Sequence, residues 1–432
     1  MKREGKPIMV LGRAAAIGAS LALQMLGAHW VKAEGPARGW IAPIRITTRA
    51  HVLGGTQLLY DSQTGDVHVF WCDNLSGTTA IAYRRWIAES QMWTPTQNLS
   101  SSPWSSLSPS ACLEADGTMH LVWCQIYAAS EGAPADGTDI LYRRYERGYW
   151  SEAQVIHHDP FYLTGGYQLV LLKAQDRLYA FASHGLASSY MYQQDGMWTD
   201  MAPWDYRISV YTGAVEGDTI HLAGFGLNSS QWMYDRYFVD AYYTRFDGQN
   251  FSEPVNISSV DGVAQDVALA IDGSGQVHLV WTDTGSPFSS ESQGSALYER
   301  VWAGGEWGPN LPISTPNPNQ AVRDVELVSD EAGGLHLAWS EGLLEQMRAI
   351  AVNLHYAHND GRGWGSEEVI LPSETSRENL ALDATASEVY LTWMEGETPP
   401  EQALYFSTTD PSVYDTPLYP VYLPWATRPE GL

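Results

Sequence analysis

Positively charged side chains are scarce in this chain of 432 residues. Lysine and arginine number 24 against 50 aspartates and glutamates, so the formal net charge is −26. Five of those basic residues stand in the first 33 positions beside a single acidic one, and the rest of the chain carries −30. Because so acidic a surface repels phosphate backbones and no basic stripe interrupts it, we expect no nucleic-acid partner.

Cysteine is also rare, with only Cys72, Cys112 and Cys124. Three cysteines in an exported chain cannot all pair with one another. One disulfide remains possible, and buried thiols that act as small apolar side chains are the alternative.

Long apolar runs are absent after residue 33. Before it, a basic start is followed by an apolar stretch through Leu26 and by Val31-Lys32-Ala33, an acceptable cleavage site. This pattern predicts a secretory signal peptide over residues 1–33, with an uncleaved N-terminal anchor as the alternative. In either case we expect the rest of the protein to be secreted or held at the cell surface, with no membrane-spanning segment after residue 33.

Helical periodicity and the familiar chemical motifs are missing too. No amphipathic stretch of helical spacing follows residue 34, which argues against a parallel α/β fold. The chain contains no His-Glu-x-x-His, no Asp-x-Asp-x-Asp-Gly and no Gly-x-Ser-x-Gly. We therefore predict no cofactor and no metal ligand, and we assign no catalytic residue.

What the chain has instead is a repeat. An aromatic residue followed six positions later by an apolar one occurs seven times, at intervals that average 54 residues. The aromatic residues are Trp40, Trp93, Trp150, Trp198, Phe251, Trp307 and Trp364. A fixed period of this size is typical of repeat architectures, in which one unit cannot bury its own apolar face.

One repeat has the pattern of four short strands. In residues 265–314 they cover 267–271, 277–281, 297–298 and 307–313, and turn residues separate them. A four-stranded antiparallel sheet repeated radially is a propeller blade. The sequence thus predicts an all-β, seven-bladed β-propeller over residues 34–410, followed by a Pro-rich tail over 411–432, and we expect a monomer.

The order of the motifs predicts how the ring closes. The first fourth-strand motif, residues 40–46, precedes any second strand, and nothing equally good follows Tyr405. The N-terminal strand is therefore predicted to complete the seventh blade, with a strand at 414–417 as the alternative. The second strands carry His68, His120, Tyr179, His221, His278, His336 and Tyr390, and the third strands carry Tyr83, Tyr142, Tyr190, Tyr243, Tyr298, Tyr356 and Tyr405.

Five of the second-strand positions are histidines, which raises the question of a metal ring. Each stands three residues before an aromatic or small residue of the same strand, so the two side chains point to opposite faces of the sheet. The histidines recur at the same position of the blades, where each blade must pack against its neighbour in the same way. We predict that they pack between blades and bond neighbouring backbone rather than bind metal.

Charged residues are predicted to meet at one mouth of the ring, where the first strands begin and the second strands end. Three arginines stand at the beginnings of first strands, and four carboxylates stand at the ends of second strands. These candidate ligand-binding residues are Arg207, Arg323, Arg377, Asp73, Asp283, Glu341 and Glu395. Converging arginines can hold a carboxylate through bidentate hydrogen bonds. The alternative is that the charges pair with each other and line a wet channel.

The longest insertions leave the same mouth, at residues 125–139, 226–240, 283–296 and 341–353. Insertions on one face often mark the binding side of a repeat fold. Trp232, Tyr234 and Tyr237 are predicted to stack on a sugar ring, with a local loop core as the alternative.

The blades resemble those of the sialidase-like superfamily, whose Asp-box (BNR) repeat occupies the turn between the third and fourth strands. The turns here read Asp195-Gly196-Met197-Trp198, Asp247-Gly248-Gln249-Asn250-Phe251 and Asp360-Gly361-Arg362-Gly363-Trp364, which are degenerate boxes. The resemblance implies three arginines on a substrate carboxylate, for which only Arg207, Arg323 and Arg377 qualify. Such enzymes usually have six blades, and no Tyr and Glu pair can be singled out.

Two functions follow as hypotheses. The first is an exported binding module that recognises glycans or protein partners at its loop-rich mouth. The second is a sialidase-like glycoside hydrolase acting on acidic sugars. Fold alone does not establish an activity, so whether the protein is an enzyme stays open at this point.

Overall fold

The computed structural model describes 15 stretches of the chain: residues 39–47, 55–74, 78–127, 136–161, 163, 166–174, 176–204, 206–227, 239–258, 263–283, 295–314, 320–345, 348–372, 375–396 and 402–413. The predicted signal peptide and residues 414–432 of the predicted tail lie outside them. Two compact units divide the chain, Met1–Gly35 and Pro36–Leu432, and every strand belongs to the second.

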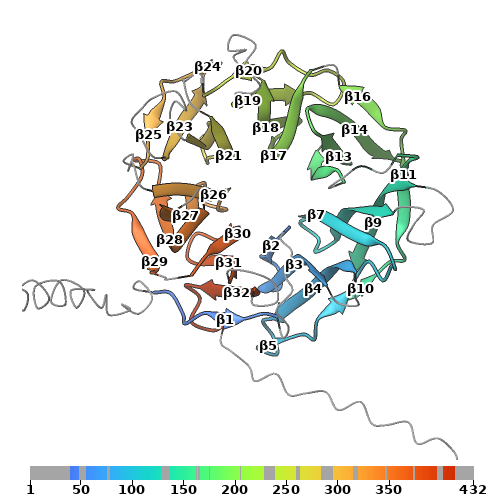
Figure 1. Cartoon of the computed structure of the whole chain (residues 1–432), viewed down its shortest axis with the longest axis horizontal. Helices are drawn as coiled ribbons and strands as arrows, with labels where there is room; N and C mark the ends of the chain where they lie inside the picture. The colour runs from blue at the N-terminus through green and yellow to red at the C-terminus, as the bar shows by residue number, and fades with distance from the viewer. Residues whose placement is uncertain are drawn as a thin grey trace, which may run out of the picture. The chain divides into compact units, whose positions relative to one another are not determined.

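The second unit is a seven-bladed β-propeller of antiparallel sheets, as predicted (Figure 1). The first four blades follow chain order. Blade 1 contains β2 (Gln57–Asp61), β3 (Asp66–Asn74), β4 (Thr79–Ile87), β5 (Met92–Trp93) and β6 (Gln97–Asn98). Blade 2 contains β7 (Ser105–Leu113), β8 (Met119–Tyr127), β9 (Gly137–Glu146), β10 (Tyr149–Trp150) and β11 (Gln154–Asp159). Blade 3 contains β12 (Gln168–Ala174), β13 (Arg177–His184), β14 (Ala187–Gln194), β15 (Met197–Trp198) and β16 (Ala202–Trp204). Blade 4 contains β17 (Ile208–Glu216), β18 (Thr219–Leu227), β19 (Val239–Phe246) and β20 (Val255–Asn256).

The last three blades complete the ring. Blade 5 contains β21 (Ala264–Ile271), β22 (Val277–Asp283), β23 (Ala296–Ala303), β24 (Glu306–Trp307) and β25 (Leu311–Pro312). Blade 6 contains β26 (Gln320–Ser329), β27 (Leu335–Glu345), β28 (Arg348–Asn359) and β29 (Glu368–Leu371). Blade 7 contains β30 (Arg377–Ala384), β31 (Val389–Glu395), β32 (Ala403–Thr408) and β1 (Ile44–Arg45).

The N-terminal strand closes the ring, which confirms the prediction. Strand β1 is the outermost strand of blade 7 and pairs Ile44 with Phe406. Two further backbone hydrogen bonds extend the pairing, from Ile41 N to Thr408 O at 2.9 Å and from Ile46 N to Leu404 O at 2.8 Å. Both ends of the propeller are thereby held in one sheet, and the alternative strand at 414–417 lies outside the described residues.

The apolar core lies between neighbouring blades. The second-strand tryptophans are no more than 1% exposed, and each packs against an adjacent blade. Trp339 of blade 6, for example, shares a cluster with Val280 and Leu297 of blade 5. Every blade therefore buries its face only against its neighbours, as the repeat predicted.

All seven predicted tyrosines lie in third strands, and the register sets two of them apart from the others. Tyr83 lies two residues before Arg85, the pairing partner of His68, and the same offset in blades 5 and 7 leads to Glu299 and Phe406. Because side chains alternate across a strand, a shift of one residue moves a side chain to the other face. Tyr298 and Tyr405 consequently stack on Trp281 and Trp393, at ring-centroid distances of 5.8 and 6.0 Å.

All three cysteines are free thiols, so the alternative of small apolar groups holds. Burial raises the pKa of each to about 12. Among the described residues, no helix has the length and hydropathy needed to cross a bilayer.

Candidate functional site

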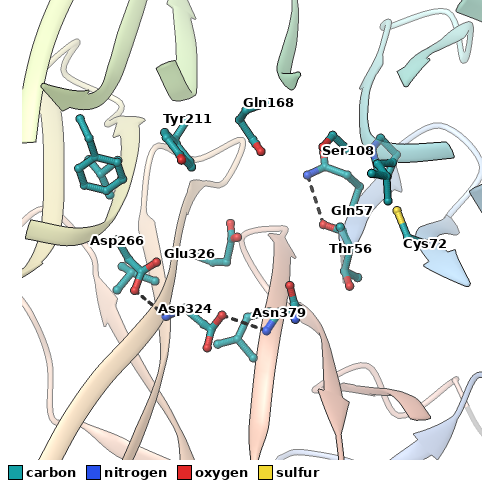
Figure 2. A pocket seen from close by; sticks show the side chains of 17 residues that line it. Thr56, Gln57, Cys72, Ser108, Gln168, Tyr211, Asp266, Asp324, Glu326 and Asn379 are labelled. Atoms are coloured by element: carbon teal, nitrogen blue, oxygen red, sulfur yellow. Dashed lines mark hydrogen bonds between the residues drawn. The ribbon is translucent and has the colours of Figure 1, made fainter. Parts of the chain in front are cut away.

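The innermost strand of each blade faces a central cavity. We call the end of the blades where these strands begin the mouth end, and the end with the hairpin to the second strand the turn end. A cavity of about 380 Å³ lies toward the mouth end, and all seven innermost strands contribute residues to it. Figure 2 shows carboxyl groups of blades 5 and 6 on one side, Gln57 and Ser108 on the other, and Tyr211 and Gln168 between them.

Five of the innermost strands carry a β-bulge at this level. The pairing of first with second strand shifts register in β7, β17, β21, β26 and β30. In three of them a residue other than glycine has positive φ, namely Ser108 (53°), Asp324 (52°) and Asn379 (55°). Aspartate and asparagine tolerate this conformation better than branched residues do, and a bulge redirects the side chains beside it.

Carboxylates of one blade accept the backbone N–H groups that the next blade's bulge releases. Asp266 Oδ2 accepts the N–H of Asp324 at 3.2 Å, and Asp324 Oδ1 accepts the N–H of Asn379 at 3.0 Å (Figure 2). The Ser340 hydroxyl donates to Asp324 Oδ2 at 3.1 Å. These bonds link blades 5, 6 and 7 and hold two acidic side chains at the cavity wall.

Glu326 lines the same wall, and no hydrogen bond to its carboxyl group occurs in the described part of the chain. Burial, followed by the charges of Asp324 and Asp266, raises the pKa of Glu326 to about 8. Burial and the Asp324 charge raise the pKa of Asp266 to about 6. At neutral pH Glu326 therefore keeps its proton and can donate a hydrogen bond, while Asp266 is mostly ionised.

The sequence-predicted charges stand at this mouth end but do not line the cavity. The Arg377 Nε donates to Glu395 Oε2 at 2.9 Å, and its Nη1 donates to the Leu371 carbonyl at 2.7 Å. Arg377 is only 7% exposed, and it pairs with Glu395, as the alternative interpretation described. Arg323 pairs in register with Ser340, and Arg207, just before β17, is exposed.

Three of the four predicted carboxylates, Asp73, Asp283 and Glu395, stand at or next to the ends of second strands as expected, whereas β27 continues four residues beyond Glu341. Asp73 Oδ2 accepts the indole N–H of Trp71 at 3.0 Å, and Glu395 Oε2 accepts that of Trp393 at 3.1 Å. Asp283 is buried at the end of β22, and Glu341 is half-buried within β27. Two of the four carboxylates thus bond a tryptophan of their own strand.

The predicted mouth loops lie mostly beyond the described residues. Trp232, Tyr234 and Tyr237 are among the residues that the structure leaves undescribed, as is most of 283–296. Of the cavity residues, the sequence interpretation missed Asp266, Asp324, Glu326 and Asn379. A signal existed, because Arg323-Asp324 and Glu378-Asn379 put two polar residues in succession inside a strand, which breaks the alternation expected of a regular strand.

A different polar arrangement recurs at the turn end. Each second-strand histidine bonds a side chain of the third strand, not backbone as predicted. The Nδ1 partners are the hydroxyls of Tyr83 for His68 (2.8 Å), Tyr142 for His120 (2.7 Å), Tyr243 for His221 (2.6 Å) and Tyr356 for His336 (2.8 Å). A tyrosine hydroxyl reaches the ring because the two residues are diagonal neighbours on one face of the sheet.

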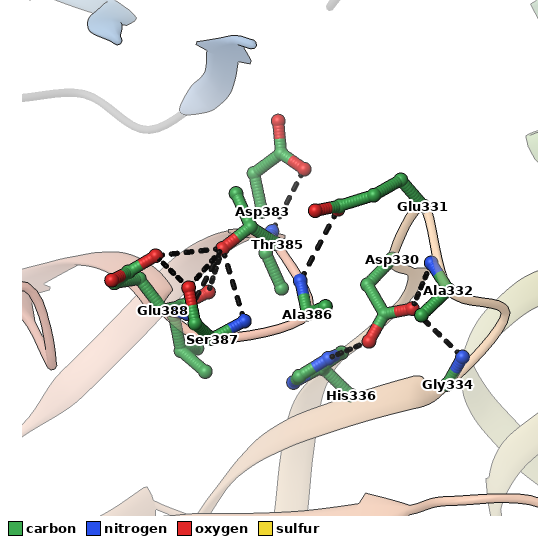
Figure 3. A network of polar contacts seen from close by, with 12 residues as sticks. Asp330, Glu331, Ala332, Gly334, His336, Asp383, Thr385, Ala386, Ser387 and Glu388 are labelled. Carbon is green, nitrogen blue, oxygen red and sulfur yellow. Dashed lines mark hydrogen bonds and ion pairs between the residues drawn. The ribbon is translucent and has the colours of Figure 1, made fainter.

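Carboxylates of the hairpin turns contact the other ring nitrogen. Nε2 lies near Glu114 in His120 (2.7 Å), Glu216 in His221 (3.7 Å), Asp272 in His278 (3.3 Å) and Asp330 in His336 (3.1 Å). Figure 3 shows the Asp330 version, in which Oδ1 also accepts the backbone N–H groups of Ala332 and Gly334. We call this set, a second-strand histidine with its third-strand partner and the carboxylate of the hairpin turn, the histidine relay. Most of its groups bond one another, which fits a structural role; in blade 4 Glu216 stays 3.7 Å from His221 Nε2, and that nitrogen has no hydrogen-bond partner among the described residues.

Blade 5 is the exception within the relay. There Glu299 takes the tyrosine position and bonds His278 Nδ1 at 2.8 Å. Burial lowers the pKa of His278, but the bonds to Glu299 and Asp272 outweigh it, and the pKa is raised. Burial lowers the pKa of His68 to about 3 and that of His221 to about 4.

Comparison with known proteins supports the fold. No protein-family model and no curated protein sequence matches the chain. A polysaccharide lyase described as the PL25 ulvan lyase superposes with a TM-score of 0.56 at 12% identity, covering 85% of this chain and 94% of that one. The polysaccharide lyase Uly1 gives 0.53 at 9% identity, covering 85% and 98%. At such identities the likeness shows the propeller fold alone.

Sialidases also occur among the structural neighbours, as the sequence resemblance implied. The NanB sialidase of Streptococcus pneumoniae, as its K499G mutant, superposes with a TM-score of 0.46 at 10% identity, covering 85% of this chain and 70% of that one. This likeness is too remote to carry an argument about activity. The PL25 ulvan lyase has also been solved with the saccharide -[GlcA(1-4)Rha3S]- bound.

Proposed function

We propose that this protein binds glycans in the cavity at the mouth end of its propeller, outside the cytoplasm. The observation that carries the proposal is the cavity of about 380 Å³ to which every blade contributes, with carboxyl, carboxamide and tyrosine side chains in its wall. Such groups donate and accept hydrogen bonds with sugar hydroxyls. The volume lies in the range of small-molecule sites.

Tyr211 supplies the stacking surface that a sugar ring requires. It is 45% exposed, and its ring meets Phe225 edge to face at a centroid distance of 5.0 Å. That contact holds the ring in place, and Tyr211 lines the cavity with Asp266 and Glu326 nearby in Figure 2. An aromatic face beside hydrogen-bonding groups suits the alternating apolar and hydroxyl surfaces of a pyranose.

The charge of the cavity selects among glycans. Its described lining contains Asp266, Asp324 and Glu326 and no lysine, arginine or histidine. A uronate or sialate would meet repulsion there, whereas a neutral or amino sugar would not. We therefore propose neutral or amino glycans as the ligand, in contrast to the acidic saccharide bound by the ulvan lyase and to the acidic sugars that the arginines suggested.

The test is a binding screen of the full chain against neutral, amino and acidic oligosaccharides. Tyr211→Ala should weaken binding at least tenfold, equivalent to about 1.4 kcal/mol, whereas Tyr149→Ala should leave it unchanged. Tyr149 is a suitable control because it is 80% exposed on β10, away from the cavity. Binding of acidic glycans that is lost in Arg207→Ala and Arg323→Ala but kept in Tyr211→Ala would overturn the proposal in favour of the arginine site.

A second candidate function is glycoside hydrolysis, and the raised pKa of Glu326 favours it. A carboxyl that stays protonated near neutral pH beside an ionised carboxylate, here Glu326 beside Asp266, is the pairing that glycosidases use to protonate a leaving group and activate water. Glu326→Gln would abolish release of reducing ends while keeping binding. Glu306→Gln, at an exposed position of β24, is the matched control. Absence of any reducing-end release by the wild-type protein on glycans that it binds would leave binding as the function.

A further inference from the structure

Blade 6 differs from blades 1 and 7 in how the mouth end of its second strand is closed. In blade 1 the Trp71 indole N–H bonds Asp73, and in blade 7 Trp393 bonds Glu395, which also binds Arg377. In blade 6 the same spacing joins Trp339 and Glu341, and in blade 5 it joins Trp281 and Asp283, but neither indole N–H meets an acceptor of the described residues in hydrogen-bonding geometry.

Glu341 instead belongs to a cluster with His355 and Glu367. One ligand atom from each of the three side chains lies within 4.8 Å of the other two. His355 stacks on Trp339 at a centroid distance of 5.3 Å and bonds Glu367 Oε1 through Nδ1 at 2.5 Å. This residue is 5% exposed, and its Nε2 is buried with no hydrogen-bond partner. In blades 1 and 7 the carboxylate at this position accepts the indole N–H, whereas in blade 6 the groups at this position are left without these partners.

Positive charge is scarce around the cluster. The ion pairs of the described residues bring no lysine or arginine to either carboxylate. Two carboxyl groups that face one buried imidazole are stabilised by a bound cation.

We propose that Glu341, His355 and Glu367 bind a divalent transition-metal ion, with Zn²⁺ as the best fit. One imidazole and two carboxylates are ligands that zinc accepts, and three protein ligands leave a position open to solvent. Glu367 has 45% of its side chain exposed, which provides an entry path. The ion would tie β27 and β28 to the segment that leads into β29, and it departs from the sequence prediction of no metal ligand.

A second group, Asp330, His336 and His358, brings ligand atoms equally close but is already satisfied. His336 uses both nitrogens, bonding Tyr356 and Asp330 as in the relay of other blades. Its recurrence without a second histidine in blades 2 and 4 shows that the relay does not need a metal ion. This group therefore serves as the internal control.

The test is Zn²⁺ binding by the full chain, measured by isothermal titration calorimetry and by the visible absorption of bound Co²⁺. We expect one equivalent at micromolar Zn²⁺ and a rise in melting temperature. His355→Gln and Glu367→Gln should each weaken binding at least tenfold, and His358→Gln should not. Glu367→Gln keeps the test sharp if His355→Gln fails to fold, because position 367 is exposed. No binding at micromolar Zn²⁺, or loss in His358→Gln with retention in Glu367→Gln, would overturn the proposal.

Discussion

The turn end and the mouth end of the blades differ in how their polar side chains are arranged, although the same strands form both. At the turn end, blades 1, 2, 4 and 6 repeat one arrangement in which a buried histidine bonds a third-strand tyrosine. At the mouth end the blades differ more: blade 7 closes an Arg377–Glu395 pair, blade 6 has its open carboxylate–histidine cluster, and blade 5 contributes Asp266 to the cavity. Repetition accompanies groups that satisfy one another, and divergence accompanies groups that face a cavity.

This difference teaches how to separate packing from binding in a repeat protein. A residue that recurs in register meets the same neighbours in each blade, so its chemistry is explained by the blade. A residue that occurs in one blade only needs a local explanation. The histidines belong to the first kind, and Glu326, Tyr211 and Glu367 belong to the second.

The largest effect should come from breaking the relay. His68→Ala leaves a cavity and an unpaired Tyr83 hydroxyl, so we expect a loss of about 2–4 kcal/mol in the free energy of unfolding. Equilibrium urea unfolding measures it. Tyr211→Ala at the mouth end should change the free energy of unfolding by less than about 0.5 kcal/mol, because substitutions at the surface usually have effects of this size. A comparable loss in both variants would remove the distinction between the two ends.

The next effect concerns the one relay with a carboxylate in place of tyrosine. Glu299→Gln removes a charged partner of His278, and we expect a loss of roughly 1.5–3 kcal/mol at pH 6. The pKa of His278 is raised in the fold, so its contribution is present below the unfolded pKa and disappears as pH rises through the folded pKa.

Unfolding of this variant and the wild type at pH 6 and pH 9 checks the prediction, with the difference expected to shrink at pH 9. NMR titration should also find His278 protonated at a pH where His68 is neutral. If the His278 and His68 imidazoles titrate at the same pH, Glu299 does not raise the pKa of His278.

A smaller effect is expected from Glu326 at the mouth end. Its pKa of about 8 exceeds the unfolded value of 4.5, so the folded state binds more protons between these limits and stability falls as pH rises through them. Glu326→Gln should therefore stabilise the protein by roughly 0.5–2 kcal/mol at pH 9 and hardly at all at pH 4. Urea unfolding across this range tests it, with the exposed Glu306→Gln as control; parallel curves for wild type and Glu326→Gln would contradict the raised pKa.

The smallest effect should come from the bulge of β30. Asn379 has a φ of 55°, which glycine adopts freely, so Asn379→Gly should change stability by less than about 0.5 kcal/mol. Asn379→Val, with a β-branched side chain, should cost more than Asn379→Gly because that conformation is unfavourable for it. Equal melting temperatures for the two variants would show that the bulge relaxes.

The fold was predictable because its evidence is local and periodic. Apolar alternation, turn residues and a recurring aromatic residue appear in every repeat, and the early position of residues 40–46 indicated ring closure. The sequence placed Tyr298 and Tyr405 in third strands, where they lie, but it did not show that they face the other side of the sheet, because an aromatic residue on either face gives the same sequence pattern.

The candidate site was harder to predict. The sequence placed Arg377 and Glu395 at the mouth end, where they pair, but it did not single out Asp266, Asp324 or Glu326. These residues reach the cavity through bulges that depend on the partner strand.

By itself the sequence determined the all-β class, the seven blades, the closing strand and the acidic surface, since each is set by composition or by a pattern repeated along the chain. Only the tertiary structure decided which polar side chains meet. A single extra residue in an innermost strand changes which side chains face the channel, and carboxylates from blades 5 and 6 become neighbours only when seven sheets pack into a ring.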